Sequence, residues 1–230
     1  MTDEGGREAA KRRAGESAAA LVADGTTVGL GTGSTAAHAI RTLGEAVDAG
    51  LDARGVPTSH QSRAVAREAG VPLVALADVE AVDVAIDGAD QVVDGGAALV
   101  KGGGAAHARE KVIDAAADRF VVVVDESKLA DALDHPVPVE VLPDARAAVA
   151  RRVREAGGEP TLRAAERKDG PVVTDNGNLV LDCDFGAVAD PAGLAGRLDA
   201  VPGVVEHGLF VDLADEVHVG SADGVRVVRP

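Results

Sequence analysis

The sequence predicts an α/β protein: a Rossmann-like doubly wound, mostly parallel sheet, with a smaller ferredoxin-like α+β domain inserted near the C-terminus. Two apolar runs of strand length, at 82–86 and 120–124, alternate with helical segments. Continuously apolar strands are typical of a parallel sheet that is covered on both faces. After about residue 134 the order becomes strand-helix-strand-strand-helix-strand, which is typical of a ferredoxin-like domain.

The first half of the chain alternates helices with short strands. The first expected helix is rich in Ala, Arg and Glu, and it stops at Asp24-Gly25. Glycine-rich turns precede two later helices. The expected helices are 4–23, 35–46 and 105–117, and the expected strands are 27–30, 71–76, 82–86 and 120–124.

The second half carries the smaller domain and a β-rich tail. The expected strands are 137–142, 160–163, 178–183 and 204–210, and the expected helices are 145–156 and 191–200. Two further β-like pieces lie between 216 and 228, and we expect them to rejoin the first domain. The predicted division is a catalytic domain at 1–133, rejoined by 211–230, and a ferredoxin-like domain at 134–210.

The charge balance restricts the class of partner. The chain has 23 basic and 38 acidic residues, a formal net charge of −15, and only five lysines. Such a surface argues against nucleic acid and anionic membranes as partners. Self-repulsion on this scale is screened by concentrated salt. The composition therefore predicts a halophilic protein, and an acidic protein from a genome of high GC content is the alternative.

Targeting and redox signals are weak in this sequence. No stretch reaches the length of an apolar membrane span, and Met1 is followed by Thr2-Asp3-Glu4 rather than by a basic and then apolar leader. Cys183 is the single cysteine and lies in a predicted strand, so we expect a buried structural thiol. We predict a cytoplasmic location.

The segment Gly31-Thr32-Gly33-Ser34-Thr35 lies between a predicted strand and a predicted helix. Two glycines allow a close backbone approach, and a helix N-terminus with three hydroxyls suits an anion. A Ser/Thr cap on a glycine turn is the structural alternative. Counted from Gly31, the loop also reads G-x-G-x-x-A, so it does not exclude a nucleotide.

Three further loops carry charged residues at or near the ends of predicted strands. Asp87-Gly88-Ala89-Asp90 follows one strand and can place two carboxylates on one substrate, although an Asp-Gly turn has the same pattern. Lys101 precedes Gly102-Gly103-Gly104, where a cation beside open N–H groups suits an oxyanion. Lys128 follows the strand at 120–124. Glu110 lies on the next helix, and its spacing alone favours a solvated charge.

The six histidines are scattered, without the spacing of a metal site. We therefore predict no metal site.

Taken together, these segments resemble the ordered signatures of the ribose-5-phosphate isomerase A family. The resemblance runs from about Lys11 to Val228, and it extends to Pro202-Gly203-Val204-Val205 and the 172–178 segment of the second half. Gln91, where an acid is common, and a longer loop at 164–170 depart from the family pattern. The motifs that carry the resemblance are Gly-Thr-Gly-Ser-Thr at 31–35, Asp-Gly-Ala-Asp at 87–90, Lys-Gly-Gly-Gly-Ala at 101–105, Arg-Glu-Lys at 109–111 and Ser-Lys at 127–128.

The resemblance implies interconversion of D-ribose 5-phosphate and D-ribulose 5-phosphate through an enediolate, without a metal or organic cofactor, in the non-oxidative pentose phosphate pathway. It implies that Glu110 is the base, and that Asp87, Asp90 and Lys101 assist ring opening and steady the enediolate. Lys11 is a further phosphate contact under the same resemblance. The implied substrate-binding residues are Gly31, Thr32, Gly33, Ser34, Thr35, Asp87, Gly88, Ala89, Asp90, Lys101, Gly102, Gly103, Gly104 and Lys128.

Three alternative functions remain at the level of sequence. A glucosamine-6-phosphate deaminase-like enzyme would share a similar fold. A non-catalytic sugar-phosphate sensor should carry a basic DNA-binding module, which this acidic chain lacks. For a nucleotide-dependent oxidoreductase, Asp52 is the only candidate ribose ligand. We expect a homodimer or homotetramer, because ferredoxin-like modules often supply an edge or face for association.

Overall fold

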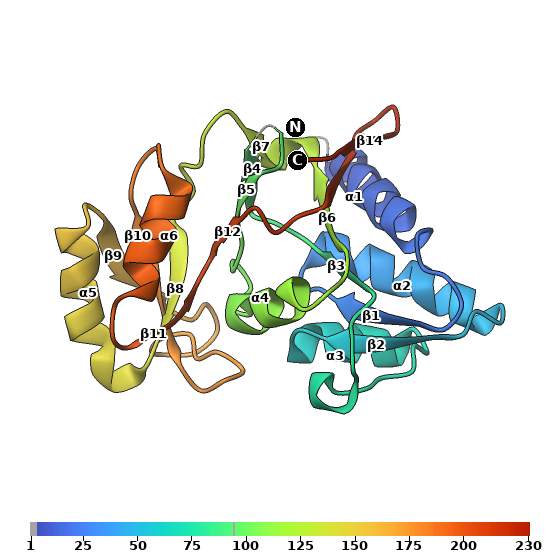
Figure 1. Ribbon diagram of the computed structural model, residues 1–230, viewed down its shortest axis with the longest axis horizontal. Coiled ribbons are helices and arrows are strands. Elements are labelled where there is room, and N and C mark those ends of the chain that lie inside the picture. Colours follow the sequence, from blue (N-terminus) through green and yellow to red (C-terminus); the bar gives the residue numbers. More distant parts are fainter. Residues whose placement is uncertain (1–3, 94) are drawn as a thin grey trace.

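The computed structural model describes residues 4–93 and 95–230 and contains three sheets (Figure 1). The largest has six strands in the order β14-β13-β6-β3-β1-β2. Its strand pairs are parallel except for the antiparallel pair of β13 with the terminal β14. The strands are β1 (Thr26–Leu30), β2 (Ala53–Pro57), β3 (Val84–Asp87), β6 (Phe120–Asp125), β13 (Glu216–Gly220) and β14 (Val225–Val228).

Both faces of this sheet are covered, as predicted for continuously apolar strands. Along β6, Val121 and Val123 join the core under the helices α1 and α2, whereas Val122 and Val124 face the opposite core with Phe210. This alternation follows from the two-residue period of a strand. The helices of this part are α1 (Glu4–Ala19), α2 (Ser34–Asp48), α3 (His60–Glu68) and α4 (His107–Ala115), with a 3-10 turn at Leu76–Asp78.

A small third sheet lies against the second face, in the order β12-β5-β4-β7. It contributes Leu99 and Phe210 to the same core. Its strands are too short for the sequence pattern to reveal, and none except the end of the 204–210 run was predicted. They are β4 (Gln91–Val93), β5 (Ala98–Val100), β7 (Leu129–Ala130) and β12 (Leu209–Val211).

The second half of the chain forms the predicted ferredoxin-like module, at the left of Figure 1. Its antiparallel sheet has the order β11-β8-β10-β9, and the helices α5 and α6 complete the predicted strand-helix-strand-strand-helix-strand order. Asp190 caps α6 by accepting from the Gly193 N–H. The elements are β8 (Val137–Val141), α5 (Arg146–Glu155) after a 3-10 turn at Pro143–Ala145, β9 (Glu159–Leu162), β10 (Leu179–Asp184), α6 (Pro191–Asp199) and β11 (Val204–His207).

The expected strand at 71–76 was wrong. Leu73 forms only an isolated bridge to Gly55, and a 3-10 turn follows from Leu76. The chain runs beside the edge strand β2, where Gly55 exchanges backbone hydrogen bonds with Pro72 and Val74. The structure adds β2 and α3, which the sequence did not predict.

The expected single strand at 204–210 was also wrong, because it divides at Gly208 into β11 and β12. Gly208 donates to the Pro138 carbonyl of β8 and accepts from the Lys101 N–H, which follows β5. These two bonds join the ferredoxin-like sheet to the small third sheet. A Cβ at Gly208 would lie 2.1 Å from the Lys101 carbonyl oxygen, so this crossing requires glycine. The tail rejoins the large sheet as β13 and β14, as expected.

Candidate active site

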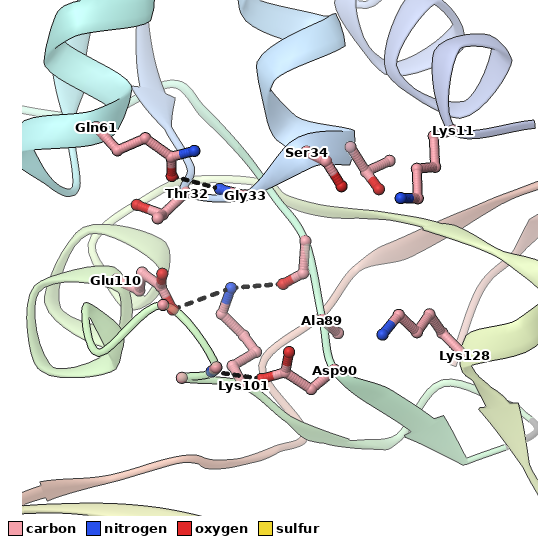
Figure 2. Close-up of a pocket in the computed structure, with 15 residues that line it drawn as sticks. Lys11, Thr32, Gly33, Ser34, Gln61, Ala89, Asp90, Lys101, Glu110 and Lys128 are labelled. Atoms are coloured by element: carbon pink, nitrogen blue, oxygen red, sulfur yellow. Dashed lines mark hydrogen bonds and ion pairs between the residues drawn. The ribbon is translucent and has the colours of Figure 1, made fainter. Parts of the chain in front are cut away.

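The loops that the sequence singled out meet at one cavity of about 330 Å³ beside the carboxyl ends of β1 and β3 (Figure 2). Ligands bind at the carboxyl ends of the strands in open parallel sheets. Of the predicted residues, Gly31 and Asp87 lie behind the wall rather than in the lining. The lining residues are Lys11, Thr32, Gly33, Ser34, Thr35, Gln61, Gly88, Ala89, Asp90, Lys101, Gly102, Gly103, Gly104, Glu110 and Lys128.

The first loop is held by contacts on both sides. The Thr32 N–H donates to Asp87 Oδ1 at 3.0 Å, and the Gly33 N–H donates to Gln61 Oε1 at 3.1 Å. Gly31 lets this loop approach β3, since a Cβ there would lie 2.2 Å from Asp87 Oδ1. Gly33 has φ +114°, and α2 starts at Ser34, one residue earlier than predicted, without a side-chain cap. The first N–H groups of α2 therefore remain available to an anion.

Lys101 follows β5 and is 2% exposed, and its ammonium is surrounded by oxygens. Nζ lies 2.9 Å from Asp87 Oδ2 and 3.4 Å from Glu110 Oε2, and it donates to the Gly88 carbonyl at 2.6 Å. Burial alone would lower the pKa of Lys101, but the neighbouring carboxylates reverse this effect and raise it. Burial raises the pKa of Asp87, while Lys101 and two backbone N–H groups oppose that shift. The neighbouring carboxylates therefore favour the charged form of Lys101.

Glu110 lies in the first turn of α4, because the helix starts at His107 and not at 105 as predicted. It is not the solvated charge that spacing alone favoured, since it is 3% exposed and faces the cavity beside Lys101 (Figure 2). Burial raises the pKa of Glu110 to about 8, against the opposing effect of Lys101. A carboxyl with a pKa near neutrality is suited to act as a general base.

Asp114 was not singled out in the sequence. It lies one helical turn after Glu110, and its Oδ2 is 3.9 Å from Lys101 Nζ. Burial and then the charge of Asp87 raise the pKa of Asp114 well above its usual value. A sequence signal was present only in its i+4 spacing from Glu110.

The glycine loop after Lys101 forms another wall. The Gly103 N–H donates to Asp90 Oδ2 at 2.7 Å, and a Cβ at Gly103 would lie 2.6 Å from Asp90 Oδ1. Gly102 adopts φ +109°, a backbone conformation that favours glycine. The backbone of this loop therefore holds the Asp90 carboxylate through the Gly103 N–H, and Gly104 lines the cavity.

The far side of the cavity is cationic. Figure 2 shows Lys11 and Lys128 on the side of Ser34, away from Glu110. Lys11 comes from α1, and Lys128 ends a 3-10 turn at Glu126–Lys128 that follows β6. Two ammonium groups that line the same cavity as the start of α2 suit a dianion such as a phosphate ester.

One group of possible metal ligands occurs among residues 4–93 and 95–230: Asp199, Glu206 and His207. It lies outside the cavity lining, and the Lys111 ammonium already contacts Glu206 Oε1 at 2.5 Å. Cys183 also lies outside the cavity lining. It is buried, as predicted, and burial raises the pKa of its thiol to about 12.

A parallel α/β sheet with a buried carboxyl, an internal ammonium and an anion site in one cavity defines an enzyme for a small phosphorylated substrate. The model of the ribose 5-phosphate isomerase A (phosphoriboisomerase A) family matches residues 54–224, and the chain belongs to this family. The ribose-5-phosphate isomerase A of Haloarcula marismortui is 68% identical, with 97% of each chain covered. That of Natronomonas pharaonis is 67% identical over 99% of this chain and 100% of the relative.

Solved structures agree with this assignment. Ribose 5-phosphate isomerase A from Methanocaldococcus jannaschii has a TM-score of 0.94 and 44% identity, with 97% of this chain and 100% of that chain covered. A D-ribose-5-phosphate isomerase in complex with phospho-erythronic acid has a TM-score of 0.93 and 43% identity, with 96% of this chain and 97% of that chain covered. The haloarchaeal relatives fit the halophilic composition.

Proposed function

We propose how the cavity residues share the interconversion of D-ribose 5-phosphate and D-ribulose 5-phosphate, the pentose phosphate pathway reaction of the family to which the chain belongs. The deaminase-like, sensor and oxidoreductase alternatives are not supported, because the relatives named above are all ribose-5-phosphate isomerases. The observation that carries the proposal is a single cavity with Glu110 and Lys101 on one side and two lysines on the other.

Glu110 is the base in this proposal. Its carboxylate takes the proton from C2 of the opened aldose, and the electron pair forms the C1–C2 double bond while O1 becomes negative. O1 then gains a proton, O2 loses its proton, and Glu110 returns its proton to C1 to give the ketose. No atom is gained or lost in this sequence. The Lys101 ammonium is 3.4 Å from Glu110 Oε2, close enough to stabilise the oxyanion of the enediolate.

Asp87 and Asp90 have different surroundings. Asp87 is fully buried and orients Lys101 through its contact at 2.9 Å. Asp90 lines the cavity and accepts from Gly103 through Oδ2, which leaves Oδ1 for a sugar hydroxyl. Asp90 is therefore the proposed partner of the sugar hydroxyls in ring opening, and Asp87 keeps the cation in place.

The phosphate is proposed to lie between Lys11, Lys128 and the start of α2 at Ser34 and Thr35. This end supplies binding energy away from the reacting carbons, and that energy orients C1 and C2 over Glu110. The phosphorylated sugar acid bound by the related structure has the same combination of a phosphate and polar oxygens, which supports this division.

Glu110→Gln tests the assignment, because it keeps the shape of the side chain and removes its basicity. General base catalysis contributes about 10²–10⁴-fold, so kcat should fall at least a hundredfold. KM should change little, since the phosphate contacts lie elsewhere. Exchange of the sugar C–H with solvent deuterium should slow in parallel.

The matched control is Glu126→Gln, because Glu126 is exposed on the loop that carries Lys128 and does not line the cavity. It should keep the kcat of the unmodified chain. If Glu110→Gln retained more than about a tenth of that kcat, Glu110 would not be the base. Asp90, which lines the cavity as Asp87 does not, would then be the first alternative to test.

We also propose a cytoplasmic homodimer or homotetramer. No helix in the described parts of the chain is long and apolar enough to cross a bilayer. Two large apolar side chains are exposed at this end of the ferredoxin-like sheet, Val205 on the edge strand β11 and Leu142 directly after the neighbouring β8, and a second copy is proposed to pack there. The proposed domain division at residue 210 falls inside β12.

A further inference from the structure

Arg163, which follows β9 in the ferredoxin-like module, reaches the active-site loop. Its Nη1 donates to the Gly102 carbonyl at 2.8 Å and to the Gly103 carbonyl at 3.1 Å. The Arg163 side chain is only 16% exposed, and its bond to Gly102 is partly buried, whereas its bond to Gly103 lies at the surface. Both acceptors belong to the glycine loop that lines the cavity.

The Arg163 guanidinium also makes two hydrogen bonds with the Asp182 carboxylate. Nε donates to Asp182 Oδ2 at 2.9 Å, and Nη2 pairs with Asp182 Oδ1 on β10. A guanidinium has five donors in a rigid planar fork, so a carboxylate that binds two of them also fixes the direction of the others. Asp182 therefore directs Nη1 toward the loop.

These contacts determine how the loop presents its N–H groups. In a trans peptide the N–H and the C=O point in opposite directions. Because the Gly102 and Gly103 carbonyls face Arg163, the N–H groups of Gly103 and Gly104 face away from it. The Gly103 N–H meets Asp90 Oδ2, the contact drawn in Figure 2, and Gly104 lines the cavity.

The loop has a backbone that needs support from outside. Gly102 has φ +109° and Ala105 has φ +57°, and a residue with a Cβ is strained in the left-handed region. The loop contains one internal backbone bond, from the Ala105 N–H to the Gly102 carbonyl. Arg163 supplies two more bonds from another sheet.

We propose that Arg163 is a positioning residue for the isomerisation: from the ferredoxin-like module it holds the 102–104 loop so that Asp90 and the Gly104 N–H meet the sugar. This inference rests on the proposed function of the cavity. It gives the ferredoxin-like module a part in the reaction, although none of its residues lines the cavity.

Arg163→Ala tests the inference. Small displacements of substrate-positioning groups can cost up to about 10²-fold in rate, so kcat should fall about 10- to 100-fold. KM should change less than about threefold, because the phosphate contacts come from α1, α2 and the 126–128 turn. Millimolar guanidinium should restore part of the lost kcat, which loss of folding stability would not allow. Arg151→Ala is the control, since Arg151 is exposed on α5, and it should leave kcat unchanged.

Hydrogen exchange gives a readout that does not depend on catalysis. The amides of residues 103–105 should exchange faster in Arg163→Ala than in the unmodified chain, and those of β8 should not change. If the chain had no isomerase activity, the proposed function would fail. Faster amide exchange in Arg163→Ala would still show that Arg163 holds the 102–104 loop. If Arg163→Ala did not fold, Arg163→Lys and Asp182→Asn should give smaller losses of kcat in the same direction. A kcat within twofold of the unmodified chain in the folded variants, or unchanged loop exchange, would overturn the proposal.

Discussion

The buried cluster around Lys101 contains one ammonium and three carboxyl groups, those of Asp87, Glu110 and Asp114. Three ionised carboxylates around one cation would leave a net charge of −2 among nearly buried side chains, which is costly. A proton is therefore retained most readily by the carboxyl groups that have the fewest hydrogen-bond donors and the longest distance to the Lys101 ammonium. Asp87 has two backbone donors and the shortest distance to Lys101, whereas neither oxygen of Asp114 has a hydrogen-bond partner in the described parts of the chain. Glu110 lies between these extremes and faces the cavity.

This arrangement predicts the pH dependence of the reaction. The base must be ionised, and burial raises the pKa of Glu110 to about 8. Below that pH Glu110 is increasingly protonated, so kcat/KM should fall about tenfold for each pH unit, and above it kcat/KM should level off. The groups that face Glu110 are Lys101 and Asp87, Asp114 on its own helix, and Asp90 across the cavity.

The measurement is kcat/KM for ribose 5-phosphate from pH 5.5 to 10 at constant salt. An inflection between about pH 7 and 9 is expected, and Glu126→Gln should reproduce it. An inflection near pH 4.5, the ordinary value for a glutamate, would show that Glu110 is not held in the buried setting described here.

Single residues of the site differ in how far the sequence could reveal them. Motifs at strand ends pointed to Asp90, Lys101 and Lys128, because carboxyl ends of parallel strands converge. Gln61 and Arg163 do not belong to a motif at the end of a predicted strand. Their roles arise from contacts across 28 to 61 positions of sequence, which depend on how separate elements pack.

At the scale of elements, the strongest patterns predicted the structure and the weak ones did not. The apolar 120–124 run became the central strand β6, but β2 has the sequence Ala-Arg-Gly-Val-Pro, which has no strand pattern. It is a strand because it pairs with β1, and Gly55 makes room for Leu30, whose Cδ1 would lie 2.3 Å from a Cβ. Tertiary contacts thus override local propensity in this strand.

Glu140, near the end of β8, joins the ferredoxin-like sheet to the turn at 174–178. Its Oε1 accepts from Thr174, Asn176 and Asn178 at 2.8 to 3.0 Å, and the side chain is completely buried. Asp175 in the same turn accepts from the His60 N–H at the start of α3, next to Gln61 of the cavity. One buried carboxylate therefore orders a turn that touches the catalytic part of the chain.

Glu140→Ala should destabilise the fold by about 3 kcal/mol, because the buried Thr174 hydroxyl and the two asparagine amides lose their shared acceptor and a buried side chain is removed. For a chain of 230 residues this corresponds to a Tm lower by roughly 6–12 °C. Thermal unfolding at fixed molar KCl measures it. Glu155→Ala, at an exposed pair on α5, should stay within about 0.5 kcal/mol. Equal shifts in the two variants would contradict the role given to Glu140.

At the scale of the whole molecule, the acidic surface sets the conditions under which the fold is stable. The net charge is −15, and the exposed ion pairs, such as Arg151 with Glu155, are of the kind that contributes little. The core is built mainly from Ala, Val and Leu, and the chain has only three aromatic residues. Uncompensated repulsion therefore acts on a core of small side chains.

Salt should stabilise this protein. At 0.01 M ionic strength the Debye length is about 30 Å, so acidic groups across the whole surface repel one another, and at 1 M it is about 3 Å. Relief of roughly 3 kcal/mol of repulsion would raise Tm by about 6–12 °C for a chain of this length. Cations that bind the native surface would add to the shift. Thermal unfolding between 0.01 M and 3 M KCl measures it, with the isomerase activity followed in the same samples. A Tm that stayed constant over this range would contradict the halophilic interpretation and leave the family assignment unchanged, because the assignment rests on the fold and the relatives rather than on charge.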